Sequence, residues 1–166
     1  MKTNSLPKKV FEAACNFKLL EKHEKYTCFK ITDGVSSDIW HVIPEKKKDF
    51  CIKRALAKLT VKEDWYAPVC RSNFEAIYFQ YCRKIAPSNF PKILGHDKKN
   101  FILAMEWYSP NQFKIWKKKL FSKNIELKDA KNVSNLLLMK DKFFFEKKFF
   151  EKKFDKDKTF YSIRIE

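Results

Sequence analysis

Residues 28–43 read Cys-Phe-Lys-Ile-Thr-Asp-Gly-Val-Ser-Ser-Asp-Ile-Trp-His-Val-Ile, and this stretch decides the fold. Residues 28–32 and 38–43 alternate between apolar and polar side chains, which is typical of strands with one buried face. The five residues between them, Asp-Gly-Val-Ser-Ser, are typical of a turn. The stretch therefore predicts a β-hairpin. After a charged connection, residues 49–53 (Asp-Phe-Cys-Ile-Lys) predict a third strand.

One helix is expected before these three strands in the sequence and another after them. Residues 5–23 carry one apolar stripe with Ser5 as the cap, and residues 72–86 carry a second stripe. Two further strands are predicted at 92–96 and 100–106. The order α, β, β, β, α, β, β predicts an α+β fold, in which a five-stranded antiparallel sheet packs against one helix.

The remainder of the chain changes in composition. Residues 110–123 and 126–139 predict two more helices, whereas residues 140–166 contain eight Lys and seven Phe and repeat the sequence Phe-Phe-Glu-Lys-Lys. A five-residue repeat gives neither a helical face nor strand alternation, so we interpret this segment as a low-complexity tail. The expected division is a first lobe at 1–108, the start of a helical lobe at 109–139, and the tail.

Charge and hydropathy restrict the partners. The 166 residues carry a net charge of +16, which attracts polyanions. Only four of the 36 basic residues are arginines, the side chain that base-reading proteins favour, so nucleic acid is a weaker expectation. The chain has no apolar run near the ~20 residues of a membrane span, and no secretory signal is recognised. We therefore expect a cytoplasmic protein with no membrane partner, and the scattered Cys and His residues predict no metal site.

Two predicted elements carry groups that can bind an anion. At the turn, Gly34 allows close backbone approach, and the hydroxyls of Ser36 and Ser37 can donate hydrogen bonds to anionic oxygens. The alternative is an ordinary hairpin turn. In the third strand, alternation places Cys51 and Lys53 on one face, and lysine is a compact cation that suits phosphate, although it can also be a solvated surface lysine.

Glu75 is a carboxylate that could pair with Lys53. It lies at the edge of the second helix's apolar stripe and can lean towards the sheet to bind the ammonium group. Ser72-Asn-Phe-Glu75 also fits a capping box, in which Glu75 would bind the first N–H group of the helix. The stripe itself consists of Phe74, Ile77, Tyr78, Tyr81 and Ile85.

These features together resemble the N-terminal lobe of the kinase-like small-molecule phosphotransferases, a family that includes aminoglycoside, choline and methylthioribose kinases. The resemblance covers residues 27–139. It implies that residues 34–38 cover the phosphates of ATP and that Cys51 lies against the adenine. It also implies that Lys53 contacts the α- and β-phosphates while Glu75 positions Lys53.

The same resemblance assigns a hinge to Ala104-Met-Glu-Trp-Tyr108, which ends the fifth strand. It implies that the Glu106 carbonyl and the Tyr108 N–H group bind the adenine edge, with Met105 at the back of the pocket. A buried strand end, with methionine filling a gap, is the alternative.

The implied activity is transfer of a phosphoryl group from ATP, with Mg²⁺, to a hydroxyl of a small molecule. In the family, a His-x-Asp loop serves the acceptor hydroxyl and a later Asp binds Mg²⁺. No histidine follows His96, and the later aspartates lack this pattern. We therefore expect a catalytically incomplete chain, truncated or frameshifted near residue 140. The alternatives are a basic non-catalytic module that binds nucleic acid or an acidic partner, and a pseudokinase-like interaction protein.

Overall fold

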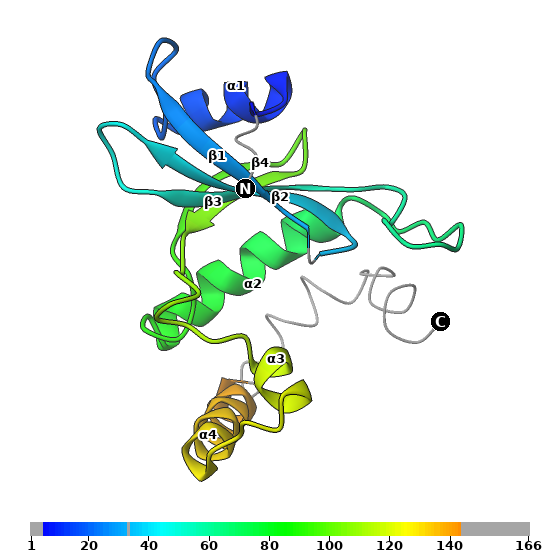
Figure 1. Cartoon of the computed structure of the whole chain (residues 1–166), viewed down its shortest axis with the longest axis vertical. Coiled ribbons are helices and arrows are strands. Elements are labelled where there is room, and N and C mark those ends of the chain that lie inside the picture. Colours follow the sequence, from blue (N-terminus) through cyan, green and yellow to red (C-terminus); the bar gives the residue numbers. More distant parts are fainter. Residues whose placement is uncertain (1–4, 33, 144–166) are drawn as a thin grey trace. The chain divides into compact units, whose positions relative to one another are not determined.

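The computed structural model describes residues 5–143 apart from Asp33, and it has an α+β architecture (Figure 1). These residues form a five-stranded antiparallel sheet and four helices, so the predicted fold class is confirmed at this level. The described residues fall into two compact units, the first ending at Trp107 and the second beginning at Tyr108. The expected tail lies outside the described residues, except for residues 140–143.

The sheet contains all five predicted strands. They are β1 (Tyr26–Ile31), β2 (Ser37–Pro44), β3 (Phe50–Ala55), β4 (Ile93–Asp97) and β5 (Ile102–Glu106). Their spatial order is β1-β2-β3-β5-β4, and every neighbouring pair is antiparallel. The third strand is therefore central, with β2 on one side and β5 on the other.

Helix α1 (Lys8–Asn16) packs on the face of the sheet that carries Phe50 and Ile52 of β3. The expected helix at 5–23 is too long. Pro7 occupies the N-cap and no side chain caps the helix, so Ser5 has no capping role. The helix ends before Lys18, which adopts a left-handed φ of 61°. The core on this face consists of Leu6, Val10, Ala13, Ala14, Leu20, Cys28, Trp40, Val42, Phe50, Ile52, Ile102 and Ala104.

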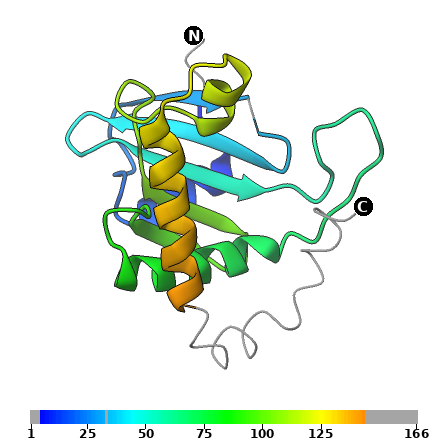
Figure 2. The ribbon, with the colours of Figure 1, turned by 90° about the horizontal axis from the view of Figure 1, so that it is seen from below.

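Helix α2 (Arg71–Ile85) packs on the opposite face, against β3, β4 and β5. In Figure 2, which views the molecule from below, α2 lies in front of the strands and α1 behind them. The expectation of one packed helix is therefore wrong, because the sheet lies between two. The most buried residues of α2 are the small Ser72, Ala76 and Cys82, whereas Phe74 and Tyr78 of the expected stripe are half-buried. Small side chains allow the helix backbone to approach the sheet.

The second unit contains helices α3 (Trp116–Phe121) and α4 (Leu127–Phe143). Helix α3 is much shorter than the predicted 110–123, because the N–H groups of Gln112 and Phe113 both bind the Ser109 carbonyl in a turn. Helix α4 continues past its predicted end at residue 139. The described helices include none with the length and apolar character needed to cross a membrane.

Candidate functional site

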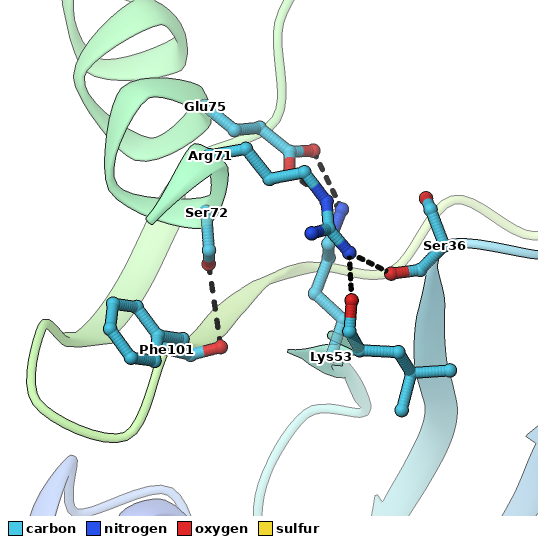
Figure 3. Close-up of polar contacts among 7 residues, drawn as sticks. Ser36, Lys53, Arg71, Ser72, Glu75 and Phe101 are labelled. Carbon is cyan, nitrogen blue, oxygen red and sulfur yellow. Dashed lines mark hydrogen bonds and ion pairs between the residues drawn. The ribbon is translucent and has the colours of Figure 1, made fainter. Parts of the chain in front are cut away.

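Lys53 of β3 and Glu75 of α2 form an ion pair (Figure 3). The Lys53 Nζ atom donates to both carboxylate oxygens of Glu75, at 2.8 Å from Oε1 and 2.6 Å from Oε2. The side chains are 15% and 32% exposed. Because α2 has no side-chain cap, the capping-box alternative is wrong and the predicted ion pair is confirmed.

The fold explains why these two groups meet. Since Ile52 points into the core beneath α1, its neighbour Lys53 points to the face that α2 covers. On α2, Glu75 lies one turn from the buried Ser72 and two turns from the buried Cys82, so it belongs to the side that faces the sheet. The Ser72 hydroxyl donates to the Phe101 carbonyl at 3.4 Å and connects this side of the helix to the β4–β5 turn (Figure 3).

The strand register brings three side chains into one row beside Lys53. His41 of β2 pairs with Cys51 of β3, and Cys51 pairs with Met105 of β5. Directly paired residues point to the same face, so the predicted neighbours Cys51 and Met105 are brought together. Burial raises the pKa of Cys51 to about 11; Lys53 makes a smaller contribution that lowers the pKa, and Glu75 one that raises it. The thiol is therefore protonated at neutral pH and suits a wall of the site rather than a nucleophile.

His41 and Trp107 were not predicted as site residues. Their rings are stacked, with centroids 3.9 Å apart and planes at 10°, and His41 Nε2 lies 2.7 Å from Asp49 Oδ2. The stack fixes the segment after β5 against β2. Strand alternation shows that His41 and Cys51 each lie on the polar face of its own strand. It does not show that the two residues are paired, because the register of β2 and β3 is not visible in the sequence.

The two predicted hinge residues belong to different units. Glu106 ends β5 in the first unit, where its carboxylate accepts the Lys92 N–H group at 2.8 Å and lies 3.5 Å from Arg83 Nη1. Tyr108 begins the second unit, where its ring lies 4.5 Å from that of Phe113. Their roles towards an adenine stay a prediction.

The turn between β1 and β2 differs in one respect from the expectation. Ser37 is the first residue of β2 and is only 8% exposed, so its hydroxyl is not part of an open turn. The Ser36 carbonyl accepts the Leu56 N–H group at 3.1 Å, and the Val35 carbonyl accepts the Thr60 N–H group at 2.8 Å. The turn is thus attached to the segment that follows β3.

Arg71, near the start of α2, is a site residue that the sequence did not reveal (Figure 3). Its Nη1 atom donates to the carbonyls of Ala67 and Pro68 at 3.0 and 2.9 Å. Its Nη2 atom donates to the carbonyl of Leu56 at 2.7 Å and to that of Ser36. Backbone carbonyls are present at every residue, so no pattern of residue types indicates which of them an arginine will bind.

The part of the site around Lys53 carries more positive than negative charge. Arg71 is one helical turn from Glu75; burial lowers the pKa of Arg71, and the Glu75 carboxylate opposes that shift. Lys53 and Arg71 thus place two positive charges near the Glu75 carboxylate. This balance suits an anionic ligand.

The described residues offer no group of three metal-binding side chains to assign to magnesium. Within the described part of the chain, no three His, Cys, Asp or Glu side chains come together in a group that could hold a metal ion. Mg²⁺ was expected from the resemblance, and no residue is assigned to it.

Comparisons with known proteins add no family. No protein-family model matches the chain, and a search of curated proteins returned no match. A function therefore has to be argued from the geometry around Lys53.

Proposed function

We propose that residues 1–108 form a kinase-like nucleotide-binding lobe, which binds ATP as part of a phosphotransferase acting on a hydroxyl of a small molecule. The observation that carries the proposal is the ion pair between Lys53 on the third strand and Glu75 on the following helix. Kinases need this pairing in place, because it holds the lysine where it meets the phosphates.

The surrounding elements support the proposal. Three antiparallel strands, a helix and two further strands follow one another in the order that the resemblance implies. Cys51 and Met105, the expected wall and back of the adenine pocket, are paired neighbours on the face of Lys53. The pairing of Cys51 with Met105 and the ion pair of Lys53 with Glu75 thus lie on one face of the sheet, although the residues come from separate parts of the sequence.

Each residue has a stated role in the proposal. Lys53 contacts the nucleotide phosphates, Glu75 holds Lys53, and the backbone from Gly34 to Ser36 covers the phosphates. Ser37 is too buried to donate its hydroxyl in this arrangement. The adenine is bound by Cys51, Met105 and the Glu106 carbonyl, and the role of the Tyr108 N–H group stays an expectation from the resemblance.

For this chain we propose binding of ATP without catalytic turnover. The 166 residues contain no His-x-Asp sequence, and phosphoryl transfer depends on positioning the acceptor and neutralising charge. We expect ATP binding without phosphorylation of a small alcohol, which is also the behaviour of a pseudokinase-like interaction protein. The cytoplasmic location expected from the sequence is part of this proposal.

A thermal unfolding experiment tests the proposal. ATP at about 100 times its dissociation constant stabilises a binding protein by about 2.7 kcal/mol, so the wild-type melting temperature is expected to rise by several degrees. Lys53→Ala is expected to abolish this rise. Lys30→Ala is the matched control, because Lys30 pairs with Asp38 at 2.7 Å on the face of α1. An ATP response that is absent from the wild type, or unchanged in Lys53→Ala, contradicts the proposal.

A second candidate is a basic non-catalytic binding module. Residues 114–119 include four lysines, and the Lys117 Nζ atom lies 5.8 Å from the ring centroid of the exposed Phe121. Cationic side chains interleaved with aromatic rings are typical of surfaces that bind single-stranded nucleic acid. The salt dependence discussed below separates this candidate from the nucleotide site.

A further inference from the structure

The guanidinium group of Arg71 connects three separate segments. Ser36 belongs to the β1–β2 turn, Leu56 follows β3, and Ala67 and Pro68 lead into α2. Each terminal nitrogen of the guanidinium carries two N–H groups, and each is hydrogen-bonded to two carbonyl oxygens. Four donors are thus matched to four acceptors, an arrangement that a planar fork provides and a single ammonium group does not.

The place of Arg71 on the helix relates this connection to the candidate site. Arg71 and Glu75 are one turn apart on α2, so one helix holds both the Ser36 carbonyl and the Lys53 ammonium group (Figure 3). A displacement of the turn relative to α2 would therefore also be a displacement relative to Lys53. The segment after β3 reinforces this attachment, because its Leu56 and Thr60 N–H groups bind the same turn.

We infer that Arg71 is a positioning residue that holds the Gly34–Ser36 turn at the phosphate end of the nucleotide site. It thereby sets the preference of the site for ATP and ADP over adenosine. The inference rests on the proposed function and assigns to Arg71 a role in phosphate recognition that Lys53 and Glu75 do not supply. Arg71 acts through the turn and does not touch the nucleotide.

Loss of Arg71 is expected to loosen the turn and leave the sheet folded. The Ser36 carbonyl keeps the N–H group of Leu56 at 3.1 Å, and the strand register does not involve Arg71. The adenine end of the site, around Cys51 and Met105, lies on strands that Arg71 does not bind through its side chain. The effect should therefore appear in the binding of phosphates and be absent from the binding of the base.

The test compares full-length Arg71→Gln with the wild type in titrations with ATP, ADP and adenosine. Arg71→Gln is expected to bind ATP and ADP roughly tenfold more weakly and to keep its affinity for adenosine. Arg71→Lys is the milder variant and should show the same selective loss, because one ammonium group cannot reach all four carbonyls. Arg83→Gln is the matched control. Arg83 lies on the same helix and donates to the carbonyls of Pro87 and Phe90 at 2.8 and 2.6 Å. It also lies 3.5 Å from the Glu106 carboxylate, so any effect of its loss should be felt at the adenine, which ATP and adenosine share, and the ratio of their affinities should stay unchanged.

Hydrogen exchange of the nucleotide-free chain gives an independent readout. The amides of Leu56 and Thr60 should exchange faster in Arg71→Gln than in the wild type or in Arg83→Gln. Unchanged exchange, unchanged ATP affinity, or an equal loss of ATP and adenosine affinity in both Arg71 variants overturns the inference while leaving the proposed function intact. A wild-type chain that binds neither nucleotide overturns the proposed function, and this inference with it.

Discussion

At the scale of single residues, the two glycines of the chain are present for different reasons. A Cβ atom on Gly95 would lie 2.1–2.5 Å from three ring atoms of Phe17, so packing of the chain itself excludes a side chain there. A Cβ atom on Gly34 would have ordinary contacts, at 3.4 Å from Ile39 Cδ1 and 3.8 Å from the Ser37 carbonyl oxygen. Neither glycine has a positive φ. The folded chain therefore does not require glycine at position 34, whereas close approach of a ligand would.

Gly34→Ala is accordingly expected to weaken ATP binding several-fold without loss of stability. The methyl group has room in the protein but would hold the turn away from the phosphates, and the free energy of unfolding should stay within about 0.5 kcal/mol of the wild type. Urea unfolding and ATP titration measure the two effects. Gly95→Ala serves as the contrasting control and should cost about 1–3 kcal/mol through overpacking against Phe17. If Gly34→Ala binds ATP with wild-type affinity, close approach of the nucleotide is not the reason for glycine at this position.

Strand alternation and helix spacing allowed the pair of Lys53 and Glu75, and the resemblance to the kinase-like lobe was needed to prefer it over a surface lysine and a capping box. They were not enough for Arg71, whose partners are backbone carbonyls, nor for the stack of His41 and Trp107. A carbonyl is present at every residue, so the sequence does not mark the ones that an arginine will bind. The stack depends on the register of β2 and β3 and on the course of the chain after β5, neither of which is a local property.

At the scale of elements, the strands were predicted to within a few residues because alternation is a local signal. The helices were predicted less well. Helix α1 stops at Asn16 because the chain turns at Lys18, and the predicted helix at 110–123 is reduced to Trp116–Phe121. Apolar spacing continues through such turns and cannot reveal them. Which face of the sheet a helix covers depends on contacts between distant parts of the chain. The sequence therefore did not show that α1 and α2 cover opposite faces.

The contact between β4 and α2 makes stability depend on pH through His96. The His96 Nε2 atom lies 2.8 Å from Asn73 Oδ1, and because this oxygen only accepts, Nε2 carries the hydrogen. Burial lowers the pKa of His96, Lys98 lowers it further, and Asp97 opposes both. The folded chain therefore resists protonation of His96 more than the unfolded chain, whose His has a pKa of about 6.5.

The expected result is a loss of stability as the pH falls below about 6.5, because the unfolded state then binds a proton that the folded state does not. This loss should stop once the pH is below the lowered pKa of His96. Urea unfolding of the wild type and His96→Gln between pH 5 and 8 measures it, and the variant should lack this component. His23→Gln, at an exposed position, should retain the wild-type dependence. An identical pH dependence in His96→Gln and the wild type would show that His96 is not the responsible group.

At the scale of the whole molecule, the net charge of +16 and the local site lead to different expectations. The charge is distributed along the chain, so it favours any polyanion, whereas the ion pair of Lys53 and Glu75 is a single place with defined geometry. Composition indicates the first property, whereas the second depends on the arrangement of β3 and α2. A measurement that responds to total charge can therefore be separated from one that responds to a single lysine.

Binding of ATP and of a single-stranded oligonucleotide should depend differently on salt. The affinity of a strand that contacts several lysines falls with a slope of about −0.7 per phosphate neutralised in a plot of log K against log salt, so it drops steeply between about 50 and 200 mM. ATP meets a single lysine in the proposed site, so its binding should fall less steeply with salt, compete with ADP and disappear in Lys53→Ala. Replacing Lys117 and Lys118 by Ala should reduce oligonucleotide binding and leave ATP binding unchanged, because neither lysine is among the residues proposed to bind the nucleotide. If the oligonucleotide instead displaces ATP, and ATP binding survives in Lys53→Ala with the same steep salt dependence, the nucleotide is bound by the general charge of the surface and the basic binding module is the correct function.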